Sequence, residues 1–180
     1  MDILDARGDV REVYASGSYG QFVAGAIWLL SAGTSIAVSH TTGIVVLLVG
    51  GAAILPITML LLKLRGGPTS LPAGHPMAAL AVQIAFTVPL GLLVAVAAAG
   101  YREEWFYPAS MVIVGAHYLP FTFLYGTVLF SVLGGLMAMG GVALALWLPN
   151  TFSTGGFATG GLLIVFAVLL GRSHQRETGR

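Results

Sequence analysis

Long apolar stretches alternate with short polar breaks along almost the whole chain. Six of the stretches are close to the roughly 20 residues that a helix needs to cross the hydrocarbon core of a bilayer. They cover residues 20–38, 43–62, 77–99, 108–125, 128–148 and 152–170. Every Asp, Glu, Lys and Arg lies outside them. The pattern therefore predicts an all-α, polytopic transmembrane bundle of about six spans, occupying residues 19–171.

The two ends of the chain differ from this domain. Residues 1–18 carry apolar side chains at roughly helical spacing between Asp and Arg residues. This spacing is typical of an amphipathic helix at the membrane interface, although a frayed, solvated terminus is an equal alternative. Residues 172–180 predict a basic tail.

Composition agrees with a bilayer as the solvent. Hydrophobic residues make up 57% of the 180 positions and charged residues only 8%, which is too apolar for one water-soluble core. The chain has no cysteine, and this excludes disulfides, thiolate nucleophiles and Cys-based metal sites. A net charge of +1 without a basic run predicts no nucleic-acid partner.

The positions of Lys and Arg predict an orientation. With six spans, seven basic residues share one face: Arg7, Arg11, Lys63, Arg65, Arg172, Arg176 and Arg180. The opposite face holds only Arg102. The positive-inside rule then puts both termini in the cytoplasm.

Small residues and prolines predict how the spans pack. Gly156 and Gly160 form a GxxxG pattern, which we interpret first as packing within the chain and second as a dimer face. Pro56, Pro89 and Pro120 each lie inside a span. Because proline removes a backbone donor, each is a candidate helix break.

Sliding the chain against itself reveals a candidate repeat. Residues 25–29 align with 115–119, and residues 50–53 align with 140–143 at the same offset. Three spans per half is an odd number, so duplicated halves would have inverted topology, as in many transporters. The alternative is chance, because Gly, Ala and Leu dominate the chain. In the repeat, His117 takes the place of Ile27, and Tyr118 that of Trp28.

A search for chemistry leaves one candidate inside the membrane. No carboxylate lies within a span to complete a catalytic group, and the histidines at 40, 75, 117 and 174 lack ligand spacing. We therefore expect no enzymatic activity, metal or cofactor. Only His40 could meet Glu103 and Glu104, which share its face.

His117 lies near the middle of the fourth span, where a titratable side chain is usually functional. We predict a midplane site for a small molecule formed by His117, Tyr118, Trp28 and Gln83. The alternative is a neutral His117 that makes one interhelical hydrogen bond, with Gln83 or Thr87 among its candidate partners.

The region of the fourth span also carries a resemblance. Residues 105–109, 114–121 and 124–126, reading WFYPA, VGAHYLPF and LYG, together with Gly25 and Trp28, resemble a family of small bacterial inner-membrane proteins with a domain of unknown function. The resemblance implies a compact multi-pass protein of the bacterial inner membrane and brings no assigned activity.

Two functions are left open by the sequence. The first is a small-solute transporter or permease with its site near His117. The second is a structural or regulatory subunit of a larger membrane complex. A homo-oligomer is compatible with both.

Overall fold

The described residues, 2–148 and 151–179 of a computed structural model, form helices joined by short turns and one longer connection. This confirms the predicted all-α class. The α-helices are α1 (Ile3–Val13), α2 (Ser18–Ala37), α3 (His40–Leu64), α4 (Ala78–Tyr101), α5 (Phe106–Tyr125), α6 (Leu129–Trp147) and α7 (Thr154–Thr178). Two 3₁₀ turns, η1 (Ala15–Gly17) and η2 (Glu103–Trp105), precede α2 and α5.

Each of the helices α2 to α7 covers one predicted span, with ends that differ by a few residues. Among the described residues, five of them are long and apolar enough to cross a membrane, and α5 is not one of these. The described residues therefore contain five candidate spans, one fewer than the about six that the sequence predicts. α5 is less apolar because it carries polar side chains such as Tyr107, His117 and Tyr118.

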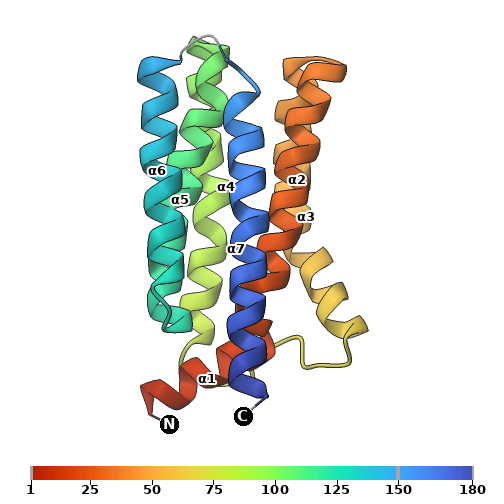
Figure 1. Cartoon of the computed structure of the whole chain (residues 1–180), viewed down its shortest axis with the longest axis vertical. Helices are drawn as coiled ribbons and strands as arrows, with labels where there is room; N and C mark the ends of the chain where they lie inside the picture. Colours follow the sequence, from red (N-terminus) through yellow and green to blue (C-terminus); the bar gives the residue numbers. More distant parts are fainter. Residues whose placement is uncertain (1, 149–150, 180) are drawn as a thin grey trace.

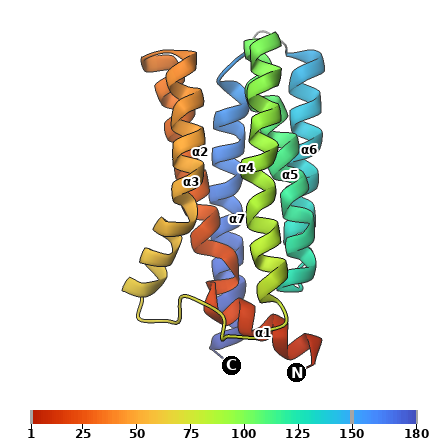
Figure 2. The ribbon, with the colours of Figure 1, turned by 180° about the vertical axis from the view of Figure 1, so that it is seen from behind.

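The long helices stand side by side, and α1 lies across one end of the bundle (Figure 1). We call this end the base. Both chain ends and the connection from α3 to α4 lie there, whereas the turns before α3, α5 and α7 lie at the opposite end, which we call the top (Figures 1 and 2). Each helix from α2 to α7 thus runs from one end of the bundle to the other.

The helices pack in an order that differs from their order in the chain. α2 packs most closely against α3 and α7, while α5 packs most closely against α4 and α6. The consecutive helices α3 and α4 barely touch, and they stand apart in Figure 2. The bundle therefore consists of two three-helix groups, and each contains one helix from the other half of the chain.

Glycines allow the closest approaches within each group. A Cβ on Gly25 would lie 3.0 Å from the carbonyl oxygen of Gly160, so α2 and α7 meet at this pair. A Cβ on Gly115 would lie 2.7 Å from the carbonyl oxygen of Gly134, which joins α5 to α6. Gly156 similarly faces Ala32 of α2. The first interpretation of the GxxxG pattern, packing within the chain, is confirmed.

The three prolines lie inside helices, as the sequence predicts. Pro56 lies in α3, Pro89 in α4 and Pro120 in α5, and none of these helices is interrupted. α3 is bent, and its last turns lean away from the rest of the bundle (Figure 1). Proline explains such a bend because its ring clashes with the preceding turn.

The N-terminal segment forms a helix and not a frayed end. The apolar face of α1, formed by Ala6, Val10 and Val13, is buried against the base of the bundle. The predicted basic tail is also helical, since α7 continues to Thr178. Arg180 lies outside the described residues.

Candidate functional site

His117 joins α5 to α4 through its imidazole ring. Its Nδ1 atom lies 2.8 Å from Thr87 Oγ1, and Thr87 Oγ1 donates its own hydrogen to the carbonyl oxygen of Ile84 at 2.7 Å. Thr87 can therefore only accept from the ring, so Nδ1 carries the hydrogen and donates it. The predicted alternative of an interhelical hydrogen bond to Thr87 is confirmed.

The other predicted site residues lie at different places. Tyr118 is buried, and its ring centroid lies 5.5 Å from that of His117. Gln83 is exposed on α4, one turn before Thr87. Trp28 is buried against Tyr107, with ring centroids 5.9 Å apart. The structure thus brings His117 and Tyr118 together, with Gln83 on the neighbouring helix, and places Trp28 in a separate aromatic cluster.

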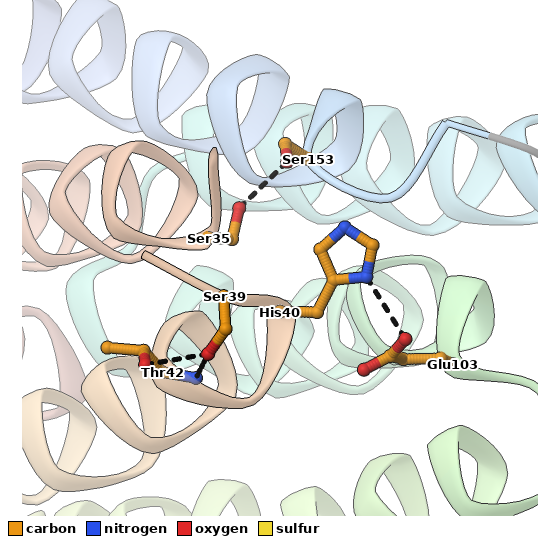
Figure 3. Close-up of polar contacts among 6 residues, drawn as sticks. All are labelled: Ser35, Ser39, His40, Thr42, Glu103 and Ser153. Carbon is orange, nitrogen blue, oxygen red and sulfur yellow. Dashed lines mark hydrogen bonds and ion pairs between the residues drawn. The ribbon is translucent and has the colours of Figure 1, made fainter. Parts of the chain in front are cut away.

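A second polar group closes the top of the bundle (Figure 3). His40 begins α3, and its Nδ1 lies 3.0 Å from Glu103 Oε2, next to the start of α5. The His40 ring also stacks on Phe152, with centroids 4.0 Å apart. His40 and Glu103, which the sequence places on the same face, are in direct contact. The contact links the two helix groups at their top.

Tyr107 carries a buried hydrogen-bond chain just below this pair. Ser31 Oγ donates to the carbonyl oxygen of Gly43 at 2.7 Å, so the Tyr107 hydroxyl, 2.6 Å away, donates to Ser31. Ser35 Oγ lies 2.7 Å from Ser153 Oγ and ties α2 to the start of α7 (Figure 3). Tyr107 is fully buried, and it is the polar link from α5 to α2.

The base contains a cleft of about 820 Å³ between α1, the end of α3 and α7. Asp5, Asp9 and Glu12 line the α1 wall, and Arg65 and His174 line the facing wall. The acidic residues follow the i, i+4, i+7 spacing of one helix face. The α1 wall therefore carries three carboxylates and the Arg11 guanidinium, and the facing wall carries the Arg65 guanidinium.

Two histidines are held at this end by defined contacts. His174 Nδ1 lies 3.2 Å from Ser16 Oγ, and Arg65 lies 3.4 Å from His174 Nε2. Because a guanidinium only donates, Nε2 accepts from Arg65. His75 accepts from the Met77 amide through Nδ1, and its Nε2 faces Asp9 Oδ2 at 3.3 Å.

α1 is fixed to the base of α5 by two arginines. Arg7 Nε donates to the carbonyl oxygen of Phe123 at 2.8 Å, and Arg11 donates to that of Tyr125 at 2.9 Å. These are carbonyls that the last turn of a helix leaves unpaired, and cations are favourable at that end of its dipole. Burial raises the pKa of Tyr14, which follows α1, and a hydrogen bond with the Leu71 backbone lowers it less.

A metal centre does not form from the described residues, since no three His, Asp or Glu side chains come together there. The paired groups are His40 with Glu103 and His75 with Asp9. Each has one carboxylate and one imidazole, and this is fewer donors than a structural metal site uses.

The fold is a helical bundle of the kind that membrane proteins form. Its long helices are apolar on their outer surfaces, and their backbone hydrogen bonds are satisfied within each helix, as the bilayer requires. The chain belongs to DUF7010, a family of unknown function, whose model matches residues 3–173. This confirms the resemblance carried by the fourth span. No curated protein and no solved structure matches the chain.

Several residues that shape these groups escaped sequence reasoning. Tyr107 and Ser31 lie in apolar segments that hide single hydroxyl groups, whereas His174 lies in the basic segment after the last span. His174 gave no signal, because its partners Ser16 and Arg65 are far from it in the chain.

Proposed function

We propose that the protein is a transporter of a small solute, built from two three-helix units that move relative to one another. The first unit contains α2, α3 and α7, and the second contains α4, α5 and α6. The observation that carries the proposal is this packing order, in which the two halves of the chain exchange their third helices. An inverted repeat that pairs α2 with α5, α3 with α6 and α4 with α7 would produce the same order.

The proposal treats α5 as the sixth span, so that both termini lie on one side of the membrane. The excess of Lys and Arg at the base supports placing that side in the cytoplasm, as part of the proposal that the protein lies in a bacterial inner membrane. α5 can be less apolar than the other spans because its two tyrosines in the helix interior, Tyr107 and Tyr118, are buried against neighbouring helices.

The two ends of the bundle differ in a way that suits a transport cycle. At the top, the Tyr107–Ser31 and His40–Glu103 contacts join the units. At the base, the cleft is open to the cytoplasm in the proposed orientation. The structure would then represent a state closed to the outside, in which solute leaves or enters at the base.

Buried polar atoms between the units support a path for solute or water. Ser110 on α5 and Thr159 on α7 are fully buried, and neither hydroxyl oxygen has a hydrogen-bond partner among the described residues. Because an unpaired buried hydroxyl is costly, a mobile polar guest in another state would stabilise it. No catalytic step is included in the proposal.

Cysteine accessibility tests whether the units separate. The chain has no cysteine, so single cysteines can be introduced without background. In membrane vesicles, we expect Ser110→Cys to react with a small, water-soluble thiosulfonate and Met137→Cys, equally buried between α5 and α6 within one unit, to stay unlabelled. If both cysteines stay unlabelled, the units do not separate.

Flux provides the second measurement. Proteoliposomes are screened with small cations, anions and amino compounds, and a Tyr107→Phe variant, which loses the hydroxyl bridge to Ser31, serves as comparison. A transporter with this top closure should show uptake that the variant changes at least severalfold. Equal flux through liposomes with and without protein would exclude transport of the tested solutes.

A second function has its own supporting observation. The hydrogen bond from His117 to Thr87 fixes α4 against α5, as expected for a structural or regulatory subunit that has no transport cycle. If the protein has that function, we expect the cysteine of Ser110→Cys to stay unlabelled by the thiosulfonate, and we expect the protein to co-purify with a larger complex.

A further inference from the structure

A polar strip crosses the outer surface of α4 and α5 at mid-membrane depth. Gln83 and Thr87 are exposed on α4, and the partly exposed His117 lies beside them on α5. The neighbouring exposed residues on this side of α4, such as Leu90 and Val94, are apolar. In the proposed membrane orientation, the strip would face hydrocarbon, where unpaired amide and imidazole groups are unfavourable.

The hydrogen-bonding state of His117 determines what the strip offers to a partner. Its Nδ1 hydrogen is used by Thr87, and the ring also lies within reach of the Ile84 carbonyl, which can only accept. In the neutral ring, Nε2 is therefore left with a lone pair and no hydrogen. The partly exposed His117 ring therefore keeps an acceptor at Nε2.

Gln83 presents the matching donor. Its side-chain amide has two N–H donors, and it lies one helical turn from the threonine that holds His117. One chain thus carries both a donor and an acceptor at similar depth on one face. Two copies related by a two-fold axis along the membrane normal can pair them reciprocally, Gln83 of one copy with His117 of the other.

We propose that this face, formed by Gln83, Leu90 and Val94 of α4 with His117 of α5, binds a second copy of the chain in the membrane. Reciprocal amide–imidazole bonds satisfy the mid-membrane polar groups, and the flanking apolar side chains pack around them. Gln83, Leu90 and Val94 lie at i, i+7 and i+11, so they form one stripe along α4. The dimer is independent of whether the protein transports a solute.

Disulfide crosslinking in native membranes tests the proposal with the full chain. Leu90→Cys lies on the stripe, and Met139→Cys on α6 is a matched control, because both positions are 66% exposed. Under mild oxidation we expect Leu90→Cys to give a band at twice the monomer mass and Met139→Cys to give none. Equal crosslinking of the two variants would indicate random collision and overturn the proposal.

Two further substitutions in the Leu90→Cys background test the polar pairing itself. Gln83→Leu removes the donor on the exposed surface, where no packing is lost. His117→Asn removes the Nε2 acceptor and keeps an N–H that can reach Thr87. Each should lower the crosslinked fraction, with a dimer dissociation constant roughly tenfold higher. An unchanged fraction in both variants would overturn the proposal.

The mass of the crosslinked product distinguishes a second copy from other occupants. Co-expression of two differently tagged chains should yield a mixed product that carries both tags. A Leu90→Cys product that contains another membrane protein in place of the second tag would show that the face belongs to a hetero-complex. If no crosslinked product forms, the face contacts lipid in the membrane, and the proposal is overturned.

Discussion

Glycines determine how closely the helices of each unit approach one another. Two adjacent glycines on α6, Gly134 and Gly135, differ in whether a neighbouring helix is close, so they distinguish the effect of close packing from the low helix propensity of glycine. A Cβ on Gly134 would lie 2.5 Å from the carbonyl oxygen of Gly115, whereas a Cβ on Gly135 would meet nothing within 4 Å. Backbone cannot move aside as a flexible side chain can. Gly134 therefore limits the α5–α6 distance, and Gly135 does not.

Substitution of each glycine by alanine should have opposite effects on stability. Gly134→Ala forces the two helices apart, and we expect a loss of about 1–3 kcal/mol. Gly135→Ala reduces backbone freedom in an open position, and we expect a gain of about 0.5–1 kcal/mol. Thermal unfolding in detergent, followed by circular dichroism, measures both variants. Equal midpoints would show that α5 and α6 do not meet at Gly134.

At the scale of elements, α1 is held to the bundle by its arginines and by its buried apolar face. The Arg7 guanidinium donates to the end of α5 and also lies over the Phe123 ring, 4.8 Å from its centroid. Between α1 and α2, Ala15, Ser16 and Gly17 all have positive φ angles. Two non-glycine residues in that region store strain, so the docked α1 must offset it.

Removal of one arginine should loosen α1 and leave the spans intact. For Arg7→Ala we expect opening of α1 to become easier by about 1 kcal/mol, with amide exchange over residues 3–13 roughly fivefold faster. Hydrogen–deuterium exchange in detergent measures this, and Glu12→Ala, an exposed position on the same helix, is the control. Similar exchange in both variants would show that the Arg7 contacts do not hold α1.

The positions of the helices could be predicted from the sequence, because short polar segments interrupt the long apolar segments and mark where each helix ends. The bounds of the third predicted span, 77–99, differ from those of α4 by one and two residues. The break predicted between residues 125 and 128 follows α5, and Gly126 there has a φ of 68°. Packing order was not predictable, because apolar helices in a bilayer present similar surfaces. The contacts of α7 with α2 depend on Gly25 and Gly160, and nothing in the local sequence links these two positions.

Some contacts of the candidate site could be predicted from the sequence and others could not. The His117–Thr87 bond was among the expected pairings because both residues are polar groups near mid-span. Trp28 was placed beside His117 through the repeat, which aligns it with Tyr118. In the structure Trp28 contacts Tyr107 at a different level of α5. Alignment by an inverted repeat relates equivalent depths in two units, and it does not imply contact between the aligned residues.

For the whole molecule, the packing order of the helices is compatible with the predicted repeat, whereas the aligned glycines make different contacts. α2 and α5 each pack against two helices, one from each half of the chain. The aligned glycines differ, because Gly25 faces α7, whereas Gly115 faces α6. If both halves descend from one ancestor, the shared feature is the exchange of the third helix, and close contacts have since changed.

The number of membrane crossings determines on which sides of the membrane the two chain ends lie, and this provides the test of α5 as a sixth span. Six crossings put both ends on one side, and five would separate them. We therefore expect Gly8→Cys and Arg176→Cys to react with a membrane-impermeant maleimide only after the cells are opened. Both positions are suitable, because Gly8 has open space around it and Arg176 is exposed.

Arg102→Cys, exposed at the top, should react in intact cells and so fix the orientation. Labelling of Gly8→Cys and Arg176→Cys from opposite sides would mean that α5 does not cross the bilayer. The inverted repeat would then be excluded as well, because three crossings in one half and two in the other cannot be related by it. Labelling of both chain ends in intact cells would keep six crossings and reverse the orientation that the basic residues predict.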